Sequence, residues 1–68
     1  DLLDVDLKRK KIDELLLQLS YEHRETYILR YQQGFSTREV AEVLEISEGT
    51  VKSRLFKATQ LITKYFNK

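Results

Sequence analysis

The stretch STREVAEVLEISEGTVKSRLFKA, residues 36–58, carries the strongest structural signals in the chain. Ser36 followed three residues later by Glu39 forms a capping box, which marks the start of a helix. Ser47 is a second N-cap residue, and it follows the first helix after only a short turn. The spacing predicts a short helix over 37–44 and a long helix over 48–66, which at about 1.5 Å per residue is long enough to lie along a DNA groove.

Apolar residues at regular positions indicate how these two helices pack. Ala41 is small where the helices should cross closely, Ile46 lies in the turn, and Val51 is the first inward residue of the second helix. A short helix, a tight turn and a long basic helix are typical of a helix-turn-helix, here over 36–66. The same pattern also fits a helical hairpin of another bundle. The predicted core consists of Val40, Ala41, Leu44, Ile46, Val51 and Leu55.

The second helix of this pair separates into two faces on a wheel of about 100° per residue. Its predicted inner arc consists of Val51, Leu55, Ala58, Ile62 and Tyr65. The opposite face carries Lys52, Ser53, Phe56, Lys57 and Gln60. Lysines can reach phosphates or guanine acceptors, Ser and Gln can bond base edges, and an aromatic ring can contact a thymine methyl group. We therefore expect this face to bind DNA.

Three residues of the same helix need separate interpretations. Phe56 points away from the core, so either DNA, a partner protein or the second helix of the domain should cover it. Arg54 flanks the inner arc, and we expect it to pair with an acid such as Glu39 or to reach the DNA backbone. Thr50, with the start of the helix, can donate a hydrogen bond to a phosphate.

The N-terminal half predicts two further helices. Leu7, Ile12, Leu15, Leu16 and Leu19 form an apolar stripe at helical spacing, which predicts a helix over 4–19. Ser20 caps a second helix over 21–33, with Tyr27, Ile28 and Tyr31 on its inner face and Gly34 as a left-handed terminating residue. His23 is interpreted as a solvated surface residue. The prediction is one all-α, four-helix domain over 1–68, in which 1–14 could partly be linker.

Composition excludes several classes of protein. The 68 residues contain no cysteine and no proline, and their net charge is +1. No His, Asp or Glu cluster has catalytic or metal-ligand spacing, so we expect no enzyme activity, no metal and no cofactor. The absence of cysteine fits the cytoplasm, and no apolar run approaches the roughly 18 residues of a membrane span, so we expect a cytoplasmic protein without membrane insertion. The chain starts at Asp1 and is expected to be a piece of a longer protein.

Charge is distributed unevenly along the chain. From residue 50 onward there is no acidic residue. The basic residues in this region are Lys52, Arg54, Lys57, Lys64 and Lys68. A basic C-terminal helix on a nearly neutral domain is a local electrostatic footprint that suits nucleic acid.

The run GTVKSRLFKA, residues 49–58, resembles the recognition helix of region 4 of bacterial sigma factors, and it is most similar to the extracytoplasmic-function (ECF) group. The resemblance covers about residues 15–62. It implies four helices that recognise the −35 element of promoters, with Lys52, Ser53, Phe56 and Lys57 at the DNA-contacting positions. It also implies binding to the flap of the RNA polymerase β subunit and, for many members, masking by an anti-sigma factor.

The sequence departs from the pattern of that family at three places. Glu45 occupies the turn where glycine is common, so we expect the turn to be either slightly strained or shifted. Thr59 and Gln60 replace an arginine-rich stretch, which should weaken the attraction to phosphate, and residues 1–14 match poorly. A LuxR-type regulator domain and a purely protein-binding helical domain remain as alternative interpretations.

Overall fold

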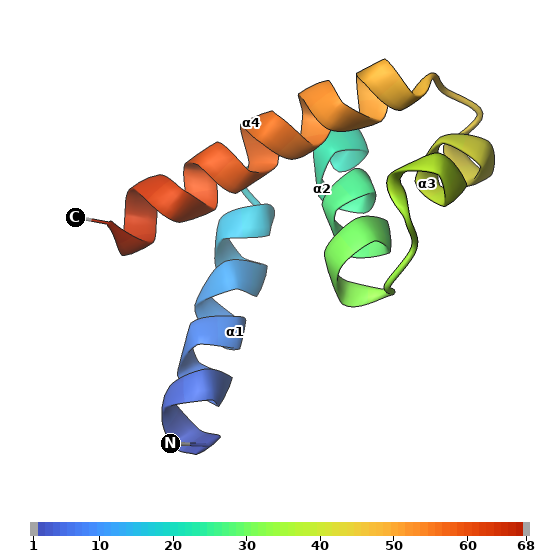
Figure 1. The fold of residues 1–68 in the computed structure, drawn as a ribbon. Coiled ribbons are helices and arrows are strands. Elements are labelled where there is room, and N and C mark those ends of the chain that lie inside the picture. Colours follow the sequence, from blue (N-terminus) through green and yellow to red (C-terminus); the bar gives the residue numbers. More distant parts are fainter. Residues whose placement is uncertain (1, 68) are drawn as a thin grey trace.

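The computed structural model describes residues 2–67, and side chains from residue 4 onward, so Asp1 and Lys68 lie outside the described residues. The elements are α1 (Leu2–Leu16), α2 (Tyr21–Tyr27), a π-helical turn η1 (Ile28–Gln32), α3 (Thr37–Leu44) and α4 (Glu48–Phe66). Over residues 2–67 there is no strand, which confirms the all-α, four-helix prediction. In Figure 1, α4 runs along one side of the molecule, and the other helices lie on the same side of it.

Among residues 4–16, helix α1 is buried only near its C-terminal end. Leu15 and Leu16 are buried, whereas Leu7 is 58% exposed. The predicted stripe is therefore wrong at Leu7, because the N-terminal half of α1 extends away from the other helices (Figure 1). The helix also ends at Leu16, not at residue 19, because residues 17–19 form a turn with hydrogen bonds from each N–H to the carbonyl three residues earlier.

The second predicted helix is divided into two forms. Ser20 caps α2 as expected, but after Tyr27 the chain continues as η1, in which the Gln33 N–H donates to the Ile28 carbonyl at 2.8 Å. Hydrogen bonds to the fifth preceding residue widen the turn and rotate the following side chains. The predicted inner face is consequently wrong at Tyr31, which is 52% exposed, while Leu29 packs on the core.

The turns on either side of α3 use left-handed backbone. Gly34 has φ of 84°, as predicted for the residue that ends the second helix. Glu45 ends α3 with φ of 56° and ψ of 47°, and the next residue, Ile46, donates its N–H to the Ala41 carbonyl at 3.0 Å. A non-glycine residue in this region is strained, as expected for Glu45. The bounds of α3 and α4 are the predicted ones, and both predicted caps are present: Ser36 with Glu39, and Ser47.

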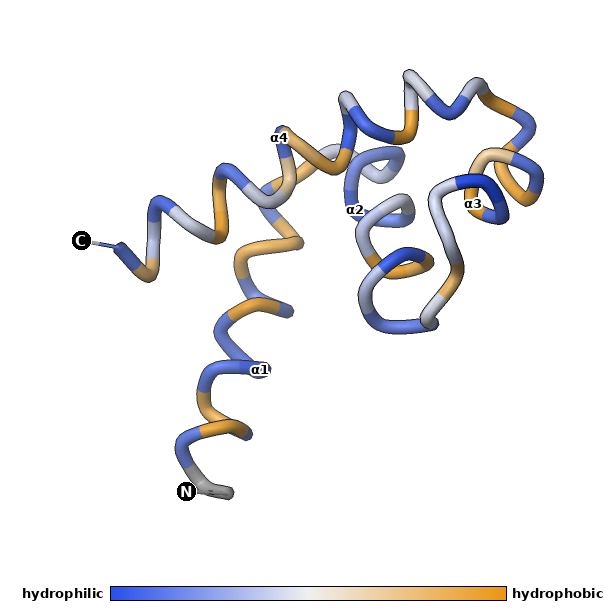
Figure 2. Tube along the Cα trace, viewed as in Figure 1, coloured by the Kyte–Doolittle hydropathy of each residue, from blue (hydrophilic) through white to orange (hydrophobic). Residues whose placement is uncertain are grey.

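The core lies where α3 and α4 cross. Val40 and Val51 are completely buried, Ala41 and Leu55 are nearly so, and these four residues form one cluster. Around the cluster pack Leu29, Phe35, Leu44 and Ile46. The hydropathy view shows hydrophobic residues recurring between hydrophilic ones along α4, as expected for a helix with one face on the core (Figure 2).

Thr26 is a buried polar residue that the apolar pattern did not predict. It is completely buried, and its hydroxyl donates to the Glu22 carbonyl at 2.7 Å. Because this hydrogen bond is made within its own helix, the hydroxyl is satisfied without a partner from another element. Thr26 can therefore be buried in α2, the helix that packs most closely on α4.

Candidate nucleic-acid interface

One face of α4 is exposed to solvent. The five residues predicted on it, Lys52, Ser53, Phe56, Lys57 and Gln60, are all exposed. On the opposite face Val51, Leu55 and Ala58 are buried, and Ile62 and Tyr65 are half-buried. The helix therefore holds its polar and basic face outward because its apolar face is fixed in the core.

Phe56 is the only aromatic residue on this face. Its side chain is 69% exposed, so of the three alternatives for what covers it, the second helix of the domain is excluded. It lines a shallow groove along α4 together with Thr59, Gln60, Thr63 and Lys64. An exposed ring costs free energy unless a partner covers it, so this position suits a contact with another molecule.

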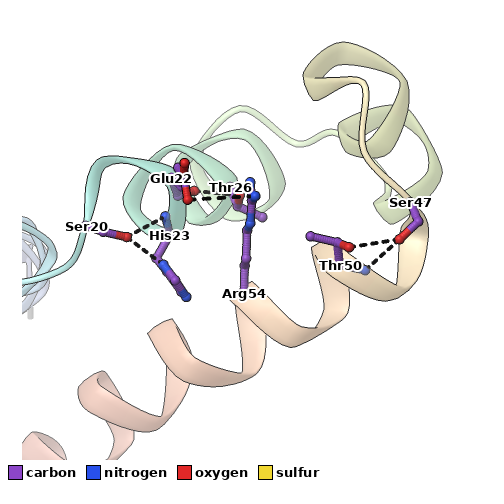
Figure 3. A network of polar contacts seen from close by, with 7 residues as sticks. All are labelled: Ser20, Glu22, His23, Thr26, Ser47, Thr50 and Arg54. Carbon is purple, nitrogen blue, oxygen red and sulfur yellow. Dashed lines mark hydrogen bonds and ion pairs between the residues drawn. The ribbon is translucent and has the colours of Figure 1, made fainter.

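Arg54 connects α4 to α2. Its side chain is only 21% exposed, and its guanidinium lies 3.9 Å from the carboxylate of Glu22 (Figure 3). Arg54 therefore pairs with an acid, as expected, but the acid is Glu22 and not Glu39, which accepts a hydrogen bond from the Ser36 N–H at 2.9 Å in the capping box. That backbone hydrogen bond lowers the pKa of Glu39. Arg54 thus lies at the edge of the exposed face and connects α4 to α2.

Thr50 is half-buried in the first turn of α4. The Ser47 hydroxyl accepts from the Thr50 N–H at 3.1 Å and lies 2.9 Å from the Thr50 hydroxyl (Figure 3). Ser47 therefore already satisfies the backbone donor of Thr50. If Ser47 donates its own hydrogen to the Thr50 oxygen, the Thr50 hydroxyl keeps its hydrogen for another acceptor, such as a phosphate.

Several charged residues elsewhere on the domain form ion pairs, whereas the two lysines on the outer face of α4 do not. Ion pairs at 3.5 Å join Lys8 to Asp4, Lys11 to Glu14 and Arg38 to Glu42. Within residues 4–67, neither Lys52 nor Lys57 makes an ion pair. Unpaired cations on one helix face produce a positive potential that attracts polyanions.

The part of the chain that the structure describes contains no group of three His, Cys, Asp or Glu residues able to hold a metal ion. None of its helices is long and apolar enough to cross a membrane. His23, interpreted from sequence as a solvated surface residue, is instead half-buried, and its Nδ1 lies 2.6 Å from the Ser20 hydroxyl. Its spacing of three residues from the N-cap was the signal available for this contact.

Comparisons with known proteins agree with this architecture. Residues 9–62 match the model of the family described as "Sigma-70, region 4". The chain is 44% identical over 62 residues to the ECF RNA polymerase sigma factor SigL of Mycobacterium tuberculosis strains H37Rv and CDC 1551. The match covers 91% of this chain and 35% of SigL, so the chain spans about a third of the length of these relatives. The LuxR-type alternative is not favoured, and the chain belongs to the Sigma-70 region 4 family.

Proposed function

We propose that this chain is the promoter-reading domain of an RNA polymerase sigma factor and recognises the −35 element of promoter DNA. The observation that carries the proposal is the exposed face of α4, whose lysines have no acidic partner within the described residues and which a buried helix-turn-helix core holds in position. In this geometry α4 enters the major groove and α3 braces the DNA backbone.

The residues of α4 divide the contacts of the proposed complex between base edges and the DNA backbone. Lys52 and Ser53 reach base edges, and the ring of Phe56 contacts a thymine methyl group. Lys57 and Thr50 contact phosphates, and Gln60 contacts a base or the backbone at the far end of the groove. Arg54 orients α4 through Glu22 and contacts DNA only at the backbone.

The test begins with selection of bound sequences from a pool of randomised duplexes by the full 68-residue chain. Binding of Lys52→Ala and Ser53→Ala is then compared on the selected duplex and on a scrambled one. Loss of a base contact reduces affinity for the selected duplex alone, by about 1–3 kcal/mol. Equal losses on both duplexes would mean that the residue contacts only phosphate. Failure to select any sequence would contradict the proposal.

The whole protein containing this domain is proposed to act in the cytoplasm with the RNA polymerase core, including the flap of its β subunit, and to be masked by an anti-sigma factor. Support comes from the family and from apolar side chains exposed on α1, the following turn and α2. These are Val5, Leu7, Leu17 and Tyr21, each more than half exposed. Charged substitutions at Leu17 and Tyr21 should reduce binding to purified polymerase core and leave DNA binding by the isolated chain unchanged.

The proposal assigns no catalytic step to the domain. A purely protein-binding domain is distinguished from a DNA reader by salt, because phosphate contacts weaken steeply as salt rises. If the affinity for duplex DNA is insensitive to salt between 50 and 200 mM, the exposed face of α4 is not a DNA-binding surface.

A further inference from the structure

The turn between α1 and α2 lies beside the exposed face of α4. A pocket of about 280 Å³ is lined by Gln18, Leu19, Ser20 and His23 on the turn side and by Lys57 on α4. A second pocket, of about 430 Å³, shares Gln18, Leu19 and Lys57 and continues along α4 to Gln60 and Lys64. The two pockets form one continuous hollow, here called the turn hollow.

Every polar residue that lines the turn hollow can donate a hydrogen bond, and none is acidic. Neither Lys57 nor Lys64 makes an ion pair with any residue between 4 and 67. The acid in the first turn of α2, Glu22, is directed to Arg54. The hollow therefore has an excess of positive charge and donors.

The hydrogen bond between His23 and Ser20 allows the imidazole to add a further donor to the hollow. Figure 3 shows its imidazole extending from the first turn of α2 toward α4, with Nδ1 beside the Ser20 hydroxyl. When the Ser20 hydroxyl donates to Nδ1, the neutral ring carries its proton on Nε2. The ring then has an N–H donor on the wall of a pocket whose opposite wall carries the Lys57 ammonium.

We propose that the turn hollow binds a phosphodiester of the DNA backbone, so that the α1–α2 turn forms a second contact beside the recognition helix. This inference rests on the proposed function, since it requires α4 to lie on DNA. Lys57 belongs both to the hollow and to the outer face of α4. It therefore lies between the part of α4 proposed to enter the major groove and the phosphate proposed to bind in the hollow. The Gln18 amide, His23 and Lys64 are the residues newly assigned to DNA binding.

The experiment uses a random-sequence duplex, because a phosphate contact does not depend on base sequence. Gln18→Glu places a carboxylate in the hollow, and Gln33→Glu adds the same charge at an exposed site after η1. We expect Gln18→Glu to weaken binding about fivefold, the effect of one unfavourable pair of unit charges at about 4 Å in water. Gln33→Glu should weaken it by less than twofold. Equal effects of the two variants would overturn the proposal.

A second measurement compares Lys64→Gln with Lys10→Gln, an exposed lysine on α1. A plot of log affinity against log salt has a negative slope, and loss of one phosphate contact reduces the magnitude of that slope by about 0.9. We expect this reduction for Lys64→Gln and not for Lys10→Gln. The same slope for wild type and Lys64→Gln contradicts the assignment of Lys64.

An NMR titration with the same duplex separates this proposal from the reading of promoter sequence. Shifts at the Gln18 side-chain amide and at His23 with random DNA support the turn hollow, even if no sequence preference is found. Shifts confined to α4 contradict phosphate binding in the turn hollow and leave the proposed role of the exposed face of α4 unaffected.

Discussion

Replacement of Glu45 by glycine should stabilise the domain. Glu45 ends α3 in the left-handed region, with φ of 56°. A non-glycine residue there is destabilised by about 1–2 kcal/mol relative to right-handed backbone. Glycine removes this strain, but it loses about 0.5–1 kcal/mol through the greater freedom of the unfolded chain. These two ranges leave a net stabilisation of about 0–1.5 kcal/mol, and its midpoint of about 0.75 kcal/mol raises the melting temperature of a domain of this size by about 3–6 °C.

Thermal and urea unfolding followed by circular dichroism measures this change, with Glu45→Ala as the matched control. Alanine removes the carboxylate as glycine does but keeps the Cβ atom that clashes in left-handed backbone. We expect Glu45→Ala to remain close to wild type. If the alanine and glycine variants gain equal stability, loss of the charge explains the effect, and the argument from backbone strain is wrong.

Three further predictions concern the stability of the fold. Gly34→Ala should lower the free energy of unfolding by about 1–2 kcal/mol, because its φ of 84° strains a residue with a Cβ even though nothing lies within 4 Å of that atom. Its control, Gly49→Ala in α4, should not lower the urea midpoint. Leu55→Ala should cost about 2–5 kcal/mol in urea unfolding, and Val43→Ala, at a residue 55% exposed, less than about 0.5; similar losses would contradict the assigned core. Because folding lowers the pKa of Glu39, its ionised carboxylate stabilises the domain. This stabilisation is complete above the pKa of the unfolded state and is lost as the pH falls through the pKa of the folded state. The stability difference between wild type and Glu39→Gln, which keeps an acceptor oxygen, should therefore change below about pH 4.5 and be constant near neutrality.

The parts of the fold predicted from sequence are those that local chemistry determines. The capping signals at Ser36 and Ser47 place both helices of the motif at the observed residues, because an N-cap satisfies orphan N–H groups within three residues of itself. The exposed and buried faces of α4 are also predicted locally, because apolar residues that recur with the 3.6-residue period of a helix fall on one side of it. Whether the exposed face binds DNA remains a prediction.

Other features depend on contacts that sequence spacing does not reveal. The pairing of Arg54 with Glu22 joins residues 32 positions apart, so it follows from how α2 packs on α4. The exposure of Leu7 follows from the direction in which α1 leaves the core, although its apolar spacing is helical. The π turn was missed because a helical period gives no sign of one additional residue.

That π turn also makes the chain tolerant of a change in length at one place. Between Ile28 and Gln32 the turn contains one residue more than a regular α-helical turn, because the Gln33 N–H donates to the carbonyl of Ile28, five residues earlier. Deleting one residue there lets the helix return to regular bonding while the ends of the segment keep their places. The same deletion in the middle of α4 would turn every later side chain by about 100° relative to the core. Insertions and deletions among related chains should therefore collect at η1 and be absent from α4.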